Sequence, residues 1–454
     1  MLAGFLSQVI YVALLFLLVV AAVFYGGSDP WWKAFLTSAI FAVGILACLE
    51  RLFSRDRRFA GVGIFLPLLA LIGFALLQTI SLGHADGSAY GIRFPFWHSI
   101  SADPYETRIF ALQFASLALL AALLLRYGTT RRRLRGLLFV IIAIALASAL
   151  FGILRQTMQH SPGFLLPVLQ PEVGYGQFIN KNHFAYLMEM GFGLAFGLVA
   201  GGGVRREGML LYVGALLPIW TALVLSNSRG GILAMLVQLL VTVLLIPLVI
   251  SGRDSQRASA WRLLRSPFTR AALICGLIAV VGAGVVWVGG DRLATRIEGA
   301  RAEFEAGPSR EGVTRLRIWA ATLQMTRAHP LAGVGMGGYW TAFPTYHDAP
   351  GTMQAQQAHN DYLELAASGG VVGLAIGAWF VVVLCKGMRA SLKSRNGFRR
   401  AACFAALIGI AGVAVHSIFD FGLHRMLNAM VFTALIVIAT YNPSGEGNRL
   451  TKDA

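Results

Sequence analysis

The sequence predicts an all-α polytopic membrane protein with about 12 transmembrane helices, and two observations carry this prediction. First, 57% of the 454 residues are hydrophobic and only 13% are charged, with a mean hydropathy of +0.67. A soluble globular domain ordinarily has about a quarter of its residues charged. Second, long apolar runs alternate with short clusters of Lys and Arg. We therefore expect residues 1–454 to form a single integral membrane domain.

Twelve apolar segments approach the roughly 20 residues that a helix needs to cross the hydrocarbon, if slightly short ones are accepted within a bundle. The first segment lacks a preceding basic region and a small-residue cleavage site, so it is predicted to be a retained span and not a signal peptide. The twelve segments lie near residues 8–25, 33–50, 61–81, 108–126, 136–154, 182–203, 209–226, 231–250, 271–289, 366–386, 401–419 and 426–441.

The basic residues predict the orientation, because short loops rich in Lys and Arg stay in the cytoplasm. The net charge of +17 and the pI near 10.3 come from clusters in alternate connections, so both termini are predicted to be cytoplasmic and no nucleic-acid partner is expected. These clusters lie at 50–58, 126–135, 204–207, 253–270 and 386–400. Neither a disulfide framework nor a zinc site is expected, because the sequence contains no CxxC pair and its four cysteines are isolated in apolar segments. They are Cys48, Cys275, Cys385 and Cys403.

The opposite face carries three longer loops, at 82–107, 155–181 and 290–365. Their Gly, Pro, aromatic and isolated polar residues are typical of folded surface. The longest loop contains a predicted amphipathic helix at 314–328, whose apolar positions are Leu316, Trp319, Leu323 and Met325. No internal repeat is visible, which argues against a transporter built from two inverted halves.

Dense polar clusters gather on this same face, at 177–184, 225–231, 314–319, 358–365 and 416–425. A site built from separate helix ends on one face is a common way to form a pocket.

His359 is the predicted reactive residue, because a His-Asn-Asp triplet at the mouth of a membrane helix is costly to desolvate. The alternative is structural: Asp361 and Glu364 would form a capping box, with Asp361 as N-cap and His359 merely interfacial.

Three arginines could hold an anionic group. Arg229 lies in a very tight turn beside Gly230 and Gly231, where a planar guanidinium could clamp phosphate oxygens with two hydrogen bonds. The alternative is that Arg229 snorkels to lipid phosphates. Arg315 and Arg317 add positive charge for an anionic headgroup, or serve only as interfacial anchors.

Two further pairs are candidate binding residues, and for each the alternative is a purely structural role. Asn180 and Asn182 open the sixth span, where capping alone explains much of the motif. His416 and Asp420 are four residues apart, so they can share a helix face and hydrogen-bond, which is also the pattern of a structural pair. A divalent metal on His359, Asp361, His416 and Asp420 is conceivable. No HExxH motif or clustered carboxylates support it, so neither metal nor cofactor is expected.

The motifs together resemble the O-antigen ligase and polymerase superfamily, bacterial membrane glycosyltransferases that use lipid-linked glycans outside the cytoplasmic membrane. The resemblance covers roughly the C-terminal two thirds, whereas the first 150 residues are similar only in hydropathy. It rests on FINKNHFA (178–185), SNSRGGILA (226–234), RIWAATLQMTRAHPLAGVGMGGY (317–339), AHNDYLELAASGGVVGL (358–374) and HSIFDFGLHR (416–425).

The resemblance implies an inner-membrane protein with a large periplasmic loop between the ninth and tenth spans, here 290–365, and a metal-independent reaction on an undecaprenyl-pyrophosphate glycan. His359 matches the essential loop histidine of the family, Arg229 the essential arginine of the turn, and Arg317 the arginine before the loop tryptophan. The His-Asn-Asp triplet departs from many ligases that use lipid A-core, and the HSxxD element is similar to members that handle exopolysaccharide, so the acceptor stays open.

The chemistry also fits the residues themselves. A sugar on pyrophosphate already has a good leaving group, so transfer needs no pair of carboxylates as in glycoside hydrolysis. It needs a base for the acceptor hydroxyl and cations for the departing diphosphate. A histidine side chain, whose ordinary pKa is about 6.5, suits the first task. We expect His359 to be the base, Arg229 and Arg317 to clamp the diphosphate, and Asn360 or Asp361 to orient the imidazole.

Three functions remain distinguishable only by experiment. A ligase moves a preassembled glycan to an acceptor such as lipid A-core, and a polymerase joins lipid-linked repeat units through the same donor site. A transporter or flippase would require paired broken helices and mid-membrane charges, of which Glu189 is the main example here.

Overall fold

The computed structural model describes residues 2–23, 25–54, 62–81, 88–89, 92–93, 99–128, 130–158, 174–249, 275–276, 279, 315–347 and 355–441. Apart from the two-residue antiparallel strands β1 (Ser88–Ala89) and β2 (Ile92–Arg93), its regular elements are helices. The larger helices are α1 (Leu2–Val23), α2 (Pro30–Phe53), α3 (Val62–Gln78), α4 (Pro104–Tyr127), α5 (Arg131–Thr157), α6 (Lys181–Ala200), α7 (Arg206–Leu225), α8 (Arg229–Val249), α11 (Arg315–Ala328), α13 (Asp361–Leu392), α14 (Gly397–His416) and α15 (Met426–Thr440).

The predicted all-α polytopic membrane fold is confirmed. Nine helices in the described part of the chain are long and apolar enough to cross a membrane, and α3 and α15 are shorter apolar helices. Each of the predicted spans coincides with one of these helices, except the segment near 271–289, most of which lies outside the described residues.

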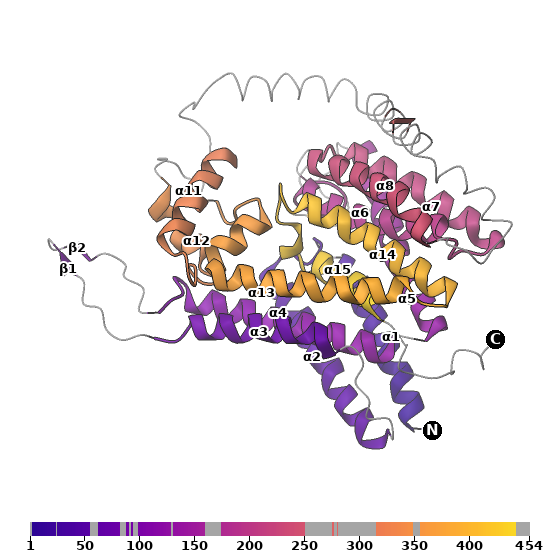
Figure 1. The fold of residues 1–454 in the computed structure, drawn as a ribbon, viewed down its shortest axis with the longest axis horizontal. Coiled ribbons are helices and arrows are strands. Elements are labelled where there is room, and N and C mark those ends of the chain that lie inside the picture. Colours follow the sequence, from indigo (N-terminus) through magenta and orange to yellow (C-terminus); the bar gives the residue numbers. More distant parts are fainter. Residues whose placement is uncertain are drawn as a thin grey trace.

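Helices α6 and α14 form the centre of the bundle, with α8 beside them (Figure 1). The most apolar stretch of α6 is 83% buried and that of α14 is 67% buried, against 28–50% for the other candidate spans in the described chain. Small residues permit this contact, because a Cβ on Gly193 would lie 2.6 Å from the backbone nitrogen of Gly409. Close backbone approach at small residues is how membrane helices associate without a hydrophobic driving force.

Helix α13 is broken at Gly370, whose φ of 58° and ψ of −156° interrupt the helix. The segment 330–335 fills the break: Val334 N donates to Ala367 O at 2.9 Å, and Val371 N donates to Pro330 O at 2.8 Å. Irregular backbone is tolerated at membrane depth only where its polar groups are satisfied, which this insertion achieves. Among the described helices, α13 alone contains such a break, so the paired breaks of a transporter are not seen there.

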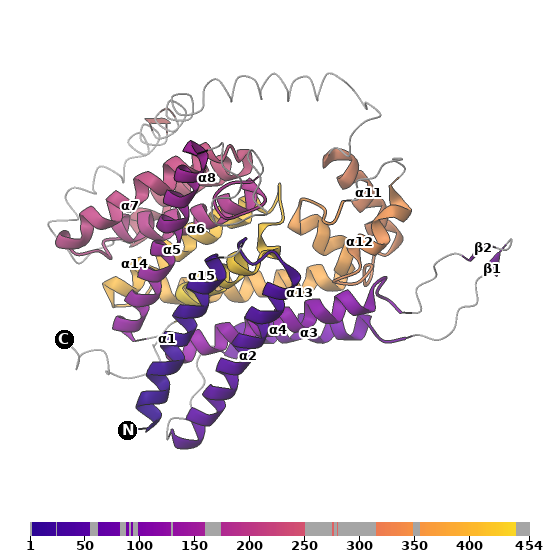
Figure 2. The same ribbon diagram turned by 180° about the vertical axis from the view of Figure 1, so that it is seen from behind.

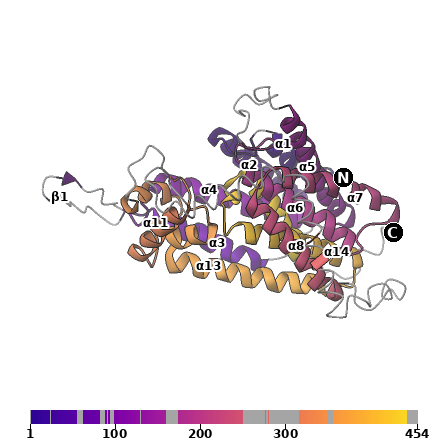
Figure 3. The same cartoon turned by 90° about the horizontal axis from the view of Figure 1, so that it is seen from above.

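A small unit stands at one end of α13, away from the N-terminus of α1 (Figure 2). It comprises α11, the short α12 (Tyr339–Ala342), the 3₁₀ turn η2 (Phe343–Tyr346) and the start of α13, around its own apolar cluster. Viewed from above, α13 runs lengthwise along one flank of the bundle, with α11 near its start (Figure 3). This unit therefore sits over the helix ends that carry the polar motifs.

The predicted amphipathic helix is present as α11, and its predicted apolar face is right for Trp319 and Met325 but wrong for Leu316 and Leu323. Leu316 and Leu323 are 67% and 45% exposed, whereas Ile318, Ala321 and Met325 are buried. The helix packs on α13 and η2 through the face that includes Ile318, so tertiary contact and not residue size selected the buried side.

Candidate functional site

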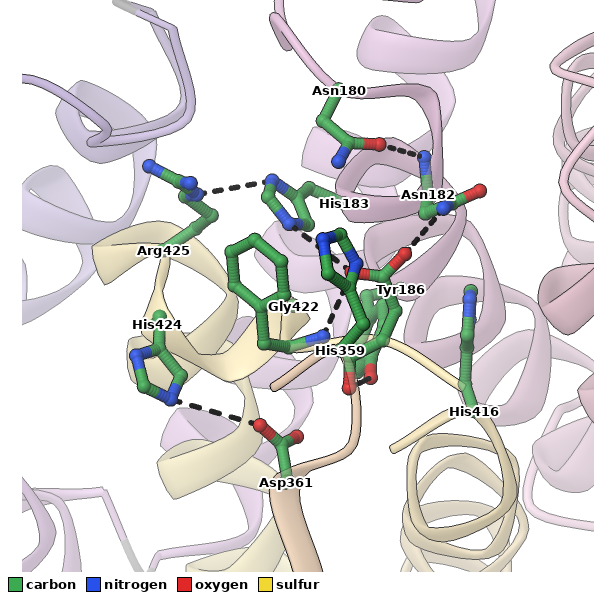
Figure 4. Close-up of polar contacts among 12 residues, drawn as sticks. Asn180, Asn182, His183, Tyr186, His359, Asp361, His416, Gly422, His424 and Arg425 are labelled. Atoms are coloured by element: carbon green, nitrogen blue, oxygen red, sulfur yellow. Dashed lines mark hydrogen bonds and ion pairs between the residues drawn. The ribbon is translucent and has the colours of Figure 1, made fainter. Parts of the chain in front are cut away.

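Asp420, in the segment between α14 and α15, is the point on which the polar motifs converge. Its carboxylate is fully buried. The Oδ1 atom lies 3.6 Å from His359 Nδ1 and 3.7 Å from His183 Nε2. The Oδ2 atom accepts a hydrogen bond from Asn182 Nδ2 and lies 3.4 Å from Arg315 Nη2. One carboxylate thus contacts groups from α6, α11 and the loop before α13. Figure 4 shows Asn182 and His183 on one helix and His359 on another segment.

The backbone around Asp420 fixes this carboxylate. Its Oδ1 accepts the N–H of Phe421 at 2.8 Å, and its own N–H donates to His416 O at 3.1 Å. Tyr186 on α6 donates its hydroxyl to Asp420 O at 3.2 Å. Burial raises the pKa of Asp420, but the contacts with His183 and His359 outweigh it and hold the pKa well below its usual value. The carboxylate is therefore ionised.

His183 is held in one tautomer by Arg425. Arg425 Nε donates to His183 Nδ1 at 3.0 Å, so that ring nitrogen carries no proton. The proton of the neutral ring then resides on Nε2, which faces Asp420. His183 thus presents a donor to the carboxylate and has no free acceptor with which to act as a base.

His359 differs from His183 in both exposure and backbone. Its side chain is 28% exposed, against 2% for His183, and its φ is 51°. A non-glycine residue in this left-handed region is strained, which is typical of functional sites. With Nδ1 turned to Asp420, the ring leaves Nε2 for another molecule.

The loop that carries His359 is pinned on both sides. Trp319 Nε1 donates to Ala358 O at 3.0 Å, and Ala358 N donates to Glu364 Oε2 at 2.8 Å. The imidazole also packs edge-on against the Phe421 ring, with centroids 4.7 Å apart. Trp319 of α11 therefore positions the histidine through the backbone of the preceding residue.

The predicted capping box is wrong by one residue. Asn360 is the N-cap of α13, because its Oδ1 accepts from Tyr362 N at 3.1 Å and from Leu363 N at 3.0 Å. Asp361 is the first helical residue, and Glu364 reaches back to Ala358 and not to Asp361. The group that faces the His359 imidazole is Asp420, while the Asp361 carboxylate lies 3.7 Å from His424 Nε2.

Asn180 and Asn182 divide their tasks at the start of α6. Asn180 caps the helix, since its side chain accepts from Asn182 N at 2.8 Å. The Asn182 side chain bridges two elements: it donates to Asp420 and accepts the Ser228 hydroxyl at 2.9 Å. Capping explains Asn180, whereas Asn182 belongs to the cluster around Asp420.

Arg229 opens α8 directly after Ser228 and is exposed. The predicted tight turn is present, with Asn227 in the left-handed region at φ 55°. Ser228 joins this turn to Asn182, and so to Asp420, and its Oγ also accepts Gly231 N at 3.2 Å. Arg229 therefore stands beside the cluster, one residue from a group bonded to it.

The two arginines at the start of α11 behave differently. Arg315, half exposed at 49%, reaches Asp420. Arg317 lies one half-turn on and makes no hydrogen bond or ion pair with the part of the chain that the structure describes. Both lie in the first turn of the helix, and the structure places only Arg315 at the cluster.

His416 and Asp420 do not pair, which corrects the predicted i, i+4 hydrogen bond. Helix α14 ends at His416, so the two side chains no longer share a helix face. His416 Nδ1 instead lies 2.6 Å from Glu189 Oε1, deep in the bundle. The four residues considered for a metal therefore do not converge, and the described residues contain no group of three or more His, Cys, Asp or Glu that could hold one.

Four helices begin at this cluster: α6, α8, α11 and α13. Helix N-termini carry partial positive charge and unpaired N–H groups, so they favour phosphate and other anions. With the nearby arginines they make the surroundings of Asp420 suited to a strongly anionic ligand. The buried carboxylate itself is neutralised by its own partners, so it need not repel that ligand.

Sequence reasoning missed several members of this site: Tyr186, Phe421, His424 and Arg425. Most lie inside the quoted motifs, so their position beside His416, Asp420 or His359 was the available signal. Nothing in the sequence distinguishes the buried His183 from the partly exposed His359, because the groups around them belong to distant segments. Arg425, before α15, bonds His183, and Trp319 of α11 holds the loop of His359.

Residues 214–378 match the family model of the O-antigen ligase. The matched stretch runs from α7 into α13 and contains Arg229, Arg315, Arg317 and His359. The resemblance to the O-antigen ligase superfamily is therefore confirmed. His183 and Asp420 lie outside the matched stretch, although they contact residues within it. No curated protein matches the sequence significantly.

Proposed function

We propose that this chain, a member of the O-antigen ligase superfamily by its matched domain, transfers a glycan from undecaprenyl pyrophosphate to an acceptor hydroxyl. The observation that carries the proposal is the contact between His359 and the buried Asp420, which Arg315 also approaches. A base held by a carboxylate and surrounded by cations is what this transfer requires.

The residues divide the reaction between them. The acceptor oxygen attacks the anomeric carbon, and His359 Nε2 takes the hydroxyl proton. Asp420 holds the imidazole by Nδ1 and stabilises the imidazolium that forms, as the carboxylate does in other Asp–His pairs. The bond from the sugar to the diphosphate oxygen breaks, and Arg229, Arg315 and Arg317 take up the charge of the departing group.

The periplasmic side of the inner membrane is the proposed location. The site lies at the start of α8 and α13 and the end of α14. Basic residues of the clustered connections lie at the opposite helix ends, such as Arg205 before α7, Arg389 late in α13 and Arg399 early in α14. Under the positive-inside rule those ends are cytoplasmic, which supports a periplasmic site and cytoplasmic termini.

The acceptor decides between two versions of this function. A ligase takes lipid A-core or another surface glycan, and a polymerase takes a second lipid-linked repeat unit. The donor groups described above serve both, so the leading proposal is the ligase and the alternative is the polymerase.

The test uses purified protein in lipid nanodiscs with an undecaprenyl-pyrophosphate oligosaccharide, with and without a lipid A-core acceptor, and with products read by gel and mass spectrometry. One transfer that requires the acceptor supports a ligase, and a ladder of repeats from donor alone supports the polymerase. Failure of the wild-type protein to form product in both arms, with correctly folded protein, overturns the proposal. Loss of activity on chelation that Mg²⁺ or Mn²⁺ restores would contradict metal independence.

A further inference from the structure

Glu189 and His416 form a buried ionisable pair in the bundle, and the proposed reaction gives this pair no role. Glu189, in the middle of α6, is fully buried, and its Oε1 lies 2.6 Å from Nδ1 of the equally buried His416. Ionisable groups inside a membrane protein are expensive to desolvate and mark functional sites by default. Their side chains are enclosed by α6, α8 and α14, so a substrate at Asp420 does not contact them.

The turn that carries Arg229 rests directly on this pair. A Cβ on Gly230 would lie 2.5 Å from both Cδ2 and Nε2 of His416. A Cβ on Gly231 would lie 3.3 Å from Glu189 Oε1. The two glycines that flank Arg229 on its C-terminal side are therefore needed for contact with the pair, and any side chain there would lift the start of α8.

The same imidazole also supports Asp420. It stacks on the Tyr186 ring, with centroids 4.2 Å apart and planes 23° apart, and Tyr186 donates to Asp420 O. His416 O accepts the Asp420 N–H at 3.1 Å. Figure 4 shows His416 and Tyr186 together below His359. The pair thus touches the arginine turn on one side and the Asp420 segment on the other.

We propose that Glu189 and His416 are positioning residues, which set the place of Arg229 relative to Asp420 so that Arg229 holds a lipid-linked diphosphate beside His359. The inference rests on the proposed function and adds to it. Glu189 keeps the His416 ring in one orientation, and the ring face supports Gly230. Neither residue touches the diphosphate; they act through Arg229. His416 is thereby reassigned from a binding residue to a support of one.

The test compares Gly230→Ala with Gly214→Ala on α7, where an added Cβ meets nothing within 4 Å. Alanine has the higher helix propensity, so a loss in Gly230→Ala must come from the contact with His416. Binding of undecaprenyl diphosphate to protein in nanodiscs is measured by native mass spectrometry, followed by donor KM, acceptor KM and kcat. Gly230→Ala should weaken donor binding by about tenfold, the value of one charge-assisted hydrogen bond, without changing acceptor KM.

The route of the effect is tested in an Arg229→Ala background. If the pair acts through Arg229, Gly230→Ala adds nothing there to the loss of donor binding. A further loss as large as in the wild-type background overturns the inference. Glu189→Gln, which keeps a hydrogen-bond acceptor for His416, should retain more donor affinity than Glu189→Leu; equal losses would count against orientation by Glu189.

The inference and the proposed function fail in different ways. If wild type neither binds the lipid diphosphate nor forms product, the proposed function fails and the inference falls with it. If wild type is active and Arg229→Ala loses donor affinity, but Gly230→Ala binds donor as Gly214→Ala does, only the positioning role is overturned.

Discussion

Two buried carboxylates at opposite ends of the bundle show how a structural pair differs from a site. Glu50 on α2 is 4% exposed, and its Oε2 accepts from Arg126 Nη2 at 3.1 Å and from Tyr127 Oη at 2.8 Å. Asp420 is equally buried and also accepts short hydrogen bonds, from Asn182 Nδ2 and Phe421 N, but its contacts to the charged or titratable side chains of Arg315, His183 and His359 are 3.4–3.7 Å long.

The difference lies in what each carboxylate is bonded to. Both partners of Glu50 lie at the end of α4 and donate hydrogen bonds to its carboxylate, so the carboxylate is satisfied within the fold. The partners of Asp420 come from three segments, and two of them, His359 and Arg315, are partly exposed. A carboxylate whose partners remain open to solvent can influence a bound molecule, whereas Glu50 stabilises only the protein. Substitution of Asp420 should therefore mainly lower the transfer rate, whereas substitution of Glu50 should mainly lower the stability of the protein.

The largest effect is expected for His359→Ala, which removes the proposed base. The transfer rate should fall about 100-fold or more, since general-base catalysis contributes roughly that much. Rates are measured with saturating donor and acceptor, and folding is checked by thermal unfolding. The matched control is His329→Ala in the unit formed by α11, α12 and η2, whose Nε2 contacts Tyr346 Oη at 2.9 Å. Turnover of His359→Ala at the rate of this control would remove the central claim.

Asp420→Asn should lower the rate by about 100-fold, because a neutral amide no longer stabilises the imidazolium. Asp103→Asn at the N-cap of α4 is the control, since asparagine caps equally well. An Asp420→Asn protein with wild-type kcat would contradict the role of the carboxylate.

The effect of Asp420→Asn on stability is also expected to depend on pH. The pKa of Asp420 is lowered in the folded state, so its charge stabilises the fold above the unfolded value of about 3.9, and this contribution is lost as pH falls below that value. The difference in unfolding temperature between wild type and Asp420→Asn should therefore shrink on acidification. A difference that is independent of pH from 7 to about 3 would exclude this linkage.

Much of this architecture could be predicted from sequence, because hydropathy and charge act locally along the chain. The spans and the Arg229 turn depend on runs of neighbouring residues and were predicted. The cluster around Asp420 depends on contacts between residues far apart in the sequence, such as Asn182 and Asp420, which are 238 positions apart and which no local pattern encodes. His416 illustrates the limit: its spacing from Asp420 predicted a pair, but α14 ends at His416 and the ring turns to Glu189. The N-cap was misplaced for a similar reason, because both Asn360 and Asp361 are good caps and the loop held by Trp319 chooses between them.

Arg229→Lys should have a smaller effect than either substitution at the His359–Asp420 contact. Lysine keeps the charge but loses the two-pronged geometry, so donor KM should rise about tenfold. Arg327→Lys, on the exposed face at the end of α11, is the control. A lysine variant with unchanged donor KM would favour the alternative in which Arg229 only snorkels to lipid phosphates.

The smallest effect on activity, and the sharpest contrast with Asp420, is expected for Glu50→Gln. Glutamine keeps a hydrogen-bond acceptor but removes the charge that Arg126 and Tyr127 satisfy, so the free energy of unfolding should fall by about 1–3 kcal/mol. The transfer rate per folded molecule should stay within about twofold of wild type, because the pair lies at the opposite helix ends from His359 and makes no contact with its partners. Unfolding in nanodiscs and kcat are measured on the same preparations. A loss of kcat comparable to that of Asp420→Asn would mean that the two carboxylates are coupled through α4 and α15, which pack together, and that Glu50 is more than a local structural pair.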